Sequence, residues 1–227
     1  MQCEKIKVLL PMKGNSERVP NKNMRDFGGI PLYHVIIKSL LDSKYVETII
    51  IDTDSKKIED DAKRTFGNKI IIINRPKEIQ GDFVSMNNII AYDLSIVKGE
   101  HFLQTHSTNP LLRTETINKA IEEYFMGLDK FDCLFGVTKV QTRFYDKNAK
   151  PINHNPNELL RTQDLEPMYE ENSNLYIFSK ESFKNVGEKR IGLKPQVFEV
   201  NKLESIDIDD IEDFRLAELL HIHKDNI

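Results

Sequence analysis

Short apolar runs alternate with helical patterns through most of the chain, and this alternation restricts the possible fold more than any other feature. The runs that predict strands are Ile6–Leu10, Thr48–Ile51, Ile70–Ile73, His101–Gln104 and Asp132–Val137. Apolar residues spaced three and four apart predict helices at Leu32–Leu41, Ser55–Phe66, Val84–Ile96 and Thr114–Met126. The pattern therefore predicts an α/β fold, a mainly parallel sheet with helices on both faces.

Several helices have recognisable first residues. Pro31 suits a first helical position, and Ser55 and Thr114 are expected N-caps. Ligands of such sheets bind beyond the carboxyl ends of the strands. We therefore expect the loop after Leu10 to converge with the segments around Arg75 and Gln104.

Composition narrows the class of protein. A chain of 227 residues with 39% hydrophobic content can bury a sizeable core in one or two domains, and we take residues 1–227 as one. Its net charge of −4, with both signs interspersed, argues against a nucleic-acid partner. No apolar run reaches the length of a membrane span, the N-terminus resembles no signal peptide, and two cysteines make no disulfide framework. We expect a soluble cytoplasmic protein with no membrane partner.

The helical pattern breaks down from Thr138 to Pro167. Asn, Pro and charged residues dominate there, with isolated Phe144, Tyr145 and Ile152. A loop of this length is either functional or a solvated surface excursion.

A basic loop, Lys13–Asn23, follows the first predicted strand. Glycine allows close approach of backbone N–H groups to a ligand, and such loops with cations commonly hold phosphate. The loop matches neither the P-loop nor the glycine-rich dinucleotide pattern, which disfavours an NAD-dependent enzyme. Phosphate binding and a solvated basic loop both remain open on this ground.

Asp207 and Asp209 flank Ile208, so both carboxylates share one face if this segment is an extended strand. Such a pair suits magnesium shared with phosphate oxygens. The alternative is a set of acids at a helix start, since Asp209, Asp210 and Asp213 would favour a helix N-terminus.

Five segments carry a resemblance that keeps its order over nearly the whole chain. They are Lys13–Asn23, Arg75–Asp82, Leu103-Gln104 with Pro110-Leu111, Arg161–Leu165 with Asn172–Ile177, and Glu204–Asp209 with Asp213-Phe214. The first is similar to Arg-x-Gly-Ser-Lys-Arg-x-Pro-x-Lys-Asn and the last to Ser-Ile-Asp-Ile-Asp. In these motifs the chain resembles the CMP-sugar synthetases, also called acylneuraminate cytidylyltransferases.

The resemblance implies a Rossmann-like nucleotidyltransferase that joins CMP from CTP to an acidic sugar and releases pyrophosphate. It implies catalytic roles for Lys22, Arg18 and Asp209, and a Mg²⁺ (or Mn²⁺) ion on Asp207 and Asp209. The nucleotide-binding residues that it implies are Lys13, Gly14, Asn15, Ser16, Arg18, Lys22, Asn23, Arg75, Asp82 and Ser85. On the acceptor side it implies Gln104, Arg161 and Tyr176, and residues 138–167 would project and build a homodimer.

His106 is a candidate from its position alone. A histidine in a Ser/Thr-rich loop beyond a strand suits contact with substrate or proton transfer, although a loop residue bonded to backbone is the other interpretation.

Departures from the family pattern concern mainly the acceptor. Lys13 replaces an arginine, which keeps the charge but loses the planar fork, and Asn15 replaces a frequent glycine. Glu17 stands where a lysine is common, which weakens the positive field of the loop. The segment Thr105–Asn109 is longer than in the family. Nonulosonic acids are the leading acceptors. The alternatives are 3-deoxy-octulosonate, a phosphonate, or a catalytically weak nucleotide-binding homologue.

Overall fold

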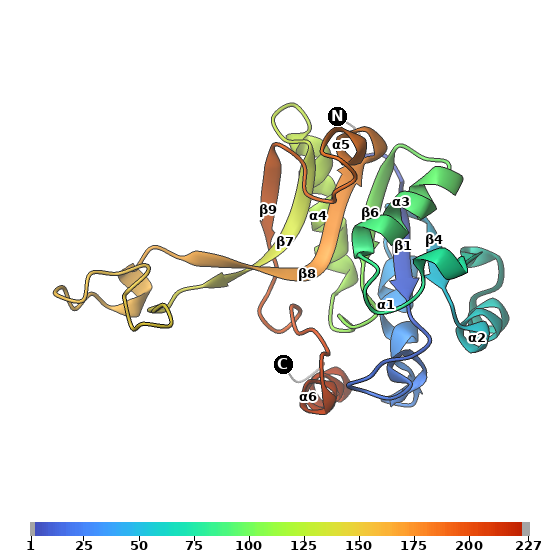
Figure 1. The fold of residues 1–227 in the computed structure, drawn as a ribbon, viewed down its shortest axis with the longest axis horizontal. Helices are drawn as coiled ribbons and strands as arrows, with labels where there is room; N and C mark the ends of the chain where they lie inside the picture. The colour runs from blue at the N-terminus through green and yellow to red at the C-terminus, as the bar shows by residue number, and fades with distance from the viewer. Residues whose placement is uncertain (1–2, 224–227) are drawn as a thin grey trace.

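The computed structural model describes residues 3–223, and one twisted sheet forms its centre (Figure 1). In the described chain this sheet has seven strands in the order β5-β4-β1-β6-β8-β7-β9. The strands are β1 Ile6–Met12, β4 Val46–Thr53, β5 Ile70–Asn74, β6 His101–Thr105, β7 Cys133–Val140, β8 Met168–Ser179 and β9 Pro195–Glu199.

Most neighbours in the sheet are parallel. Strands β5, β4, β1 and β6 run parallel to one another, and β9 runs parallel to β7. Only β8 is antiparallel to its two neighbours. The predicted α/β fold with a mainly parallel sheet is therefore confirmed.

Helices cover both faces of the sheet. They are α1 Leu32–Leu41, α2 Lys56–Phe66, α3 Met86–Ile96, α4 Thr114–Gly127 and α5 Lys180–Asn185. A further helix, α6 Ile211–Ile222, lies away from the sheet and packs in a separate apolar cluster. Side chains of α1, α2 and α4 share one buried cluster with one face of β1, and α3 and α5 share a second cluster with the other face. This division follows from the side-chain alternation of a strand, since Val8 and Leu9 enter different clusters.

The predicted helix starts are partly correct. Ser55 caps α2 by accepting a hydrogen bond from the Ile58 N–H. Pro31 occupies the N-cap of α1 rather than its first turn. Thr114 is not the N-cap of α4, because its hydroxyl instead donates to the Ser39 carbonyl oxygen at 2.8 Å and joins α4 to α1.

A third apolar cluster joins the two ends of the chain. A short hairpin, β2 Asp26–Phe27 and β3 Ile30–Pro31, precedes α1. Phe27 packs edge-on against Phe214 of α6, with ring centroids 5.4 Å apart, and Val19 and Ile208 are buried beside them. This packing fixes the segment before α6 against the loop that follows β1.

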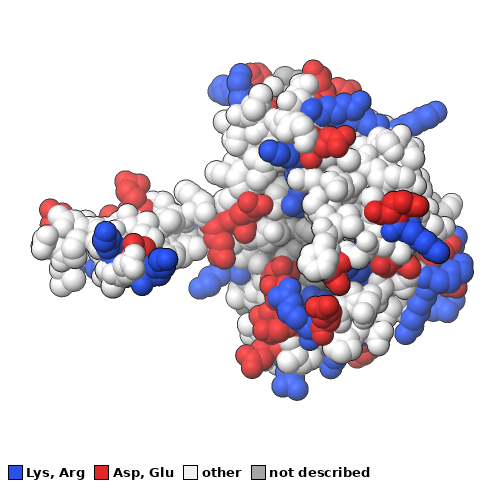
Figure 2. All heavy atoms as spheres, in the orientation of Figure 1, with Lys and Arg blue, Asp and Glu red and all other residues white. Residues whose placement is uncertain are grey.

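Residues 141–167 project from the body on the paired ends of β7 and β8 (Figure 1). Exposed apolar side chains on the projection include Tyr145, Ile152 and Leu159, the last 94% exposed. Acidic and basic side chains are interspersed on the body and on the projection (Figure 2). No helix within residues 3–223 is long and apolar enough to cross a membrane.

A buried acid pair lies beneath the loop that follows β1. The Arg75 guanidinium forms an ion pair with Asp52 and also donates to the Asp52 carbonyl oxygen at 3.1 Å. Asp93 of α3 is fully buried beside Asp52, and its carboxylate oxygens have no hydrogen-bond partner outside this pair within residues 3–223. Burial, and then the charge of Asp52, raises the pKa of Asp93 to about 9, so Asp93 holds a proton that it can share with Asp52.

We expect the Asp93→Asn variant to remove a pH dependence of stability. The wild-type folded state binds a proton at Asp93 that the unfolded chain releases near pH 4, so wild-type stability falls as pH rises towards 9. The Asn amide keeps a donor towards Asp52 and does not titrate. Thermal unfolding should give wild type a midpoint a few degrees below the variant at high pH, and similar midpoints near pH 4. Asp129→Asn, at an exposed site, is the control, and a parallel pH profile for all three proteins would contradict the shared proton.

Candidate functional site

A cavity of about 370 Å³ lies at the carboxyl ends of β1 and β6. Residues from the loop after β1, the loop before α3 and the loop after β6 line it. The predicted site residues in its wall are Lys13, Asn15, Ser16, Arg18, Lys22, Asn23, Asp82 and His106. The structure thus brings together most of the predicted nucleotide-binding loop.

The cations of this loop are paired with acidic or carbonyl groups. Lys13 Nζ lies 2.8 Å from Asp82 Oδ1, and Arg18 Nη2 lies 2.7 Å from Asp209 Oδ1. Lys22 Nζ donates to the Ile208 carbonyl oxygen at 2.5 Å. These contacts join the loop to the segment before α6 and hold three positive charges at one cavity.

Two further contacts position the loop. The Asn23 amide donates to the Lys13 carbonyl oxygen at 2.8 Å, and the Ser107 hydroxyl donates to Asn23 Oδ1 at 2.7 Å. Position 14 requires glycine because the backbone there lies close to Ser55. A Cβ at this position would lie 2.7 Å from the Ser55 Cβ. Its N–H already donates to Asp54 Oδ1 at 2.6 Å, so this donor serves the fold of the loop.

Asp207 and Asp209 lie in an irregular segment and not in a strand, so the condition for a shared strand face is not met. Asp210 is the N-cap of α6 and forms a capping box with Asp213. The two interpretations of the acids therefore apply to different residues: Asp210 and Asp213 start the helix, and Asp207 and Asp209 face the cationic loop.

The environment of Asp207 fits a cation. Burial, and the nearby charge of Asp209, raise the pKa of Asp207, while burial lowers the pKa of Lys22. Asp207 Oδ1 is buried and has no hydrogen-bond partner. No three His, Cys, Asp or Glu side chains within residues 3–223 are grouped to hold a metal, so these two carboxylates would share one with a ligand.

Some predicted residues lie outside the cavity wall. Arg75 is buried against Asp52 and supports the loop from below, and Ser85 caps α3 by accepting from the Asn88 N–H. Arg161 lies on the projection and pairs with Asp164 at 2.7 Å. Direct contacts of these residues with a nucleotide or an acceptor remain predictions.

The acceptor-side residues form a network with an arginine that sequence reasoning missed. Gln104 and Tyr176 are buried, and at most 1% of the surface of either residue is exposed. Arg190, from the loop after α5, donates from Nη1 to Gln104 Oε1 at 2.7 Å, and its guanidinium carbon lies 4.0 Å from the centre of the Tyr176 ring. No motif surrounds Arg190 in the sequence, so only the fold reveals it.

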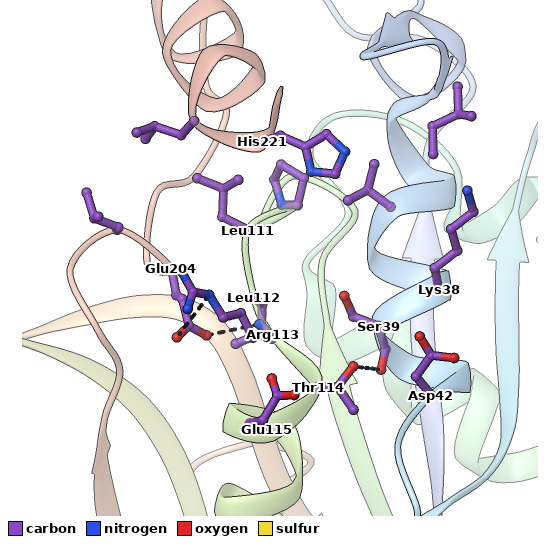
Figure 3. Close-up of a pocket in the computed structure, with 15 residues that line it drawn as sticks. Lys38, Ser39, Asp42, Leu111, Leu112, Arg113, Thr114, Glu115, Glu204 and His221 are labelled. Atoms are coloured by element: carbon purple, nitrogen blue, oxygen red, sulfur yellow. Dashed lines mark hydrogen bonds and ion pairs between the residues drawn. The ribbon is translucent and has the colours of Figure 1, made fainter. Parts of the chain in front are cut away.

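A larger cavity of about 580 Å³ lies elsewhere, between α1, the start of α4 and α6 (Figure 3). Glu204 accepts from the Arg113 N–H at 2.9 Å there and lies 4.0 Å from the Arg113 Nε. None of the predicted site residues lines it. The predicted site residues therefore gather at the smaller of these two cavities and not at the larger one.

Solved structures with this fold define the class of protein. CMP:2-keto-3-deoxy-manno-octonic acid synthetase, complexed with CTP, superposes with a TM-score of 0.70 at 12% identity and covers 97% of this chain and 100% of its own. The 4-diphosphocytidyl-2C-methyl-D-erythritol synthase of Anaerococcus prevotii superposes with a TM-score of 0.65 at 14% identity, covering 96% of both chains. The fold is that of α/β nucleotidyltransferases.

Sequence comparison gives the family. The cytidylyltransferase model matches residues 7–225, so this chain belongs to the cytidylyltransferase family and is an enzyme of that class. The pseudaminic acid cytidylyltransferase of Campylobacter jejuni subsp. jejuni serotype O:2 is 26% identical over 226 residues, 94% of each chain. The N-acylneuraminate cytidylyltransferase of Escherichia coli O18:K1:H7 is 26% identical over 228 residues, 94% of this chain and 51% of its own. The predicted resemblance to CMP-sugar synthetases is confirmed.

We expect Glu17→Lys to lower the Michaelis constant for CTP severalfold. Glu17 is exposed, lines the cavity and forms no ion pair within the described chain, so its charge opposes a triphosphate. A screened interaction of this kind is worth roughly 1 kcal/mol and weakens with salt. Steady-state kinetics at low and high salt measure the change, and Asp129→Lys, far from the cavity, is the charge-matched control. A constant that is equal in both variants would show that Glu17 does not act on the phosphates.

Proposed function

We propose that this enzyme transfers CMP from CTP to an acidic sugar of the nonulosonic-acid type and releases pyrophosphate. The observation that carries the proposal is that Lys13, Arg18 and Lys22 line one cavity. The segment of Asp207 and Asp209 is held against it, since Arg18 pairs with Asp209 and Lys22 donates to the Ile208 carbonyl oxygen. Cations suit the triphosphate, and the carboxylates suit a divalent cation shared with it. A cytoplasmic location, where CTP is available, belongs to the same proposal.

The reaction needs positioning and charge more than covalent help from the protein. A sugar hydroxyl attacks the α-phosphorus, the bond to pyrophosphate breaks, and the hydroxyl proton is lost to solvent. Lys22 and Arg18 neutralise charge that grows on the leaving pyrophosphate, and preorganised cations do this without reorganisation. Lys13 and Asn23 keep the loop in the shape that receives the phosphates.

Asp207 and Asp209 would hold Mg²⁺ or Mn²⁺. The orphaned Asp207 Oδ1 and the acceptor-only carboxylate of Asp209 are oxygen ligands of the kind these ions prefer. When bound, the ion supplies Lewis-acid stabilisation of phosphate charge and lowers the pKa of a coordinated hydroxyl. Arg18 holds Asp209 in place until the ion and the nucleotide arrive.

The acceptor follows from the relatives. Two of the relatives are named for pseudaminic acid and N-acylneuraminate, and each matches 94% of this chain. The long Thr105–Asn109 loop and the arginine at Arg190 would adapt the acceptor side. A pyrophosphate-release screen with CTP and a panel of acidic sugars tests the assignment, with 3-deoxy-octulosonate and a phosphonate included. CTP binding without release on any acceptor would instead support the nucleotide-binding homologue.

Asp207→Asn and Asp209→Asn should each reduce turnover about a hundredfold or more while the protein stays folded. Removal of a carboxylate ligand takes away charge stabilisation worth several kcal/mol. Asp210→Asn is the matched control, because Asn caps helices as well as Asp does and should leave turnover near wild type. Pyrophosphate release at saturating CTP and magnesium measures all three. Equal activity in all of them would refute the metal assignment.

We further propose that the segment 138–167, which contains the projection, forms a homodimer interface. The apolar side chains of Tyr145, Ile152 and Leu159 are exposed on the projection. Exposed apolar groups favour burial against a partner. Through the dimer, Arg161 of one subunit would reach the site of the other. Light scattering at micromolar concentration should give twice the chain mass, and Leu159→Asp with Ile152→Asp should give a monomer. A monomeric wild-type protein would contradict the proposal and support the interpretation of this segment as a solvated surface excursion.

A further inference from the structure

His106 enters the cavity wall through a defined hydrogen bond. Its ring Nε2 lies 3.0 Å from the side-chain nitrogen of Gln104, and the same nitrogen donates to the Thr105 carbonyl oxygen at 2.8 Å. Gln104 is fully buried, so water does not compete for these contacts.

Arg190 fixes which end of the Gln104 amide faces His106. A guanidinium only donates, and Arg190 Nη1 lies 2.7 Å from Gln104 Oε1. The amide oxygen therefore faces Arg190 and the NH₂ group faces His106. Because an NH₂ group only donates, His106 Nε2 must accept and carry no proton. The proton of the neutral ring is then on Nδ1.

The Nδ1 atom is free to meet a ligand. His106 lines the cavity and is half-buried, and Nδ1 has no hydrogen-bond partner within residues 3–223. Nδ1 is not fully buried, so this edge of the ring opens to the cavity. An N–H donor therefore points into space that a substrate would fill.

The surrounding charge keeps the ring neutral. Burial, and then the Arg190 charge, lower the pKa of His106 to about 4. The other charged side chains that line the cavity are Lys13, Glu17, Arg18, Lys22 and Asp82. A protonated ring would also set its Nε2–H against the Gln104 NH₂ group, donor against donor.

We propose that Arg190 acts through Gln104 as a positioning residue that fixes His106 as a neutral Nδ1–H donor to an oxygen of the bound substrate. His106 is then not the general base, because Nδ1 already holds its proton and Nε2 is occupied. The identity of the substrate rests on the proposed function, but the tautomer does not.

Nitrogen-15 NMR of the full-length, ligand-free protein with labelled histidine tests the tautomer. Comparison with His106→Asn assigns the ring signals, which should show the Nδ1–H form down to about pH 5. In Gln104→Glu, a carboxylate paired with Arg190 cannot donate, so the proton should move to Nε2 and the pKa should rise above its ordinary value. Arg190→Met should yield a mixture of tautomers, which keeps the test available if Gln104→Glu does not fold. A wild-type ring in the Nε2–H form, or a tautomer unchanged in Arg190→Met and Gln104→Glu, would overturn the proposal.

Paired substitutions at His106 test the donor itself. In His106→Asn the side-chain amide nitrogen would lie near the position of the histidine Nδ1. In His106→Gln it would lie near the position of Nε2. His106→Asn should keep the acceptor Michaelis constant within about threefold of wild type, and His106→Gln should raise it about tenfold, as for one lost hydrogen bond. Equal losses would overturn the donor role. A correct tautomer in a protein that releases no pyrophosphate would refute the proposed function alone.

Discussion

The packing of α6 on the hairpin after the basic loop is the contact on which the site depends. Phe214 and Ile208 bury apolar surface against Phe27 and Val19, and each such side chain contributes about 1.5–3 kcal/mol when fully buried. The Arg18–Asp209 pair spans 191 residues of sequence but both side chains are more than half exposed, so it is worth at most about 1 kcal/mol. The apolar cluster therefore brings Arg18 and Asp209 together, and their ion pair contributes little to the stability of the cluster.

The loop that this packing positions carries its own counter-charges. Asp82 pairs with Lys13 and Asp209 pairs with Arg18, so a bound triphosphate would have to displace these partners. Such exchange favours a ligand with several negative charges over a single anion. The proton on Asp93 lets the Arg75–Asp52 pair remain buried beneath the same loop without a second uncompensated charge.

Local pattern explains why much of the fold could be predicted. Strand β1 and helices α1 and α2 follow hydrophobic periodicity and a Ser55 cap, which act within a few residues. Asp207 and Asp209 do not share a strand face, because the Ile208 N–H between them donates to the Thr108 carbonyl oxygen of a loop rather than to a sheet edge. Thr114 was misassigned because its hydroxyl reaches Ser39 of another helix, a contact that local spacing does not encode.

The sequence by itself determined the α/β class and the family, and it predicted which charged residues form the basic loop, because periodicity and short motifs are local and need no tertiary contact. Tertiary structure alone decided that Asp210 caps a helix while Asp207 Oδ1 is buried without a hydrogen-bond partner among the described residues, and that Arg190 orients Gln104 and thereby His106. The physical reason is that burial, counter-charge and the direction of a hydrogen bond belong to pairs of residues far apart in the chain. Only the folded sheet and the packing of its ends bring those pairs within bonding distance.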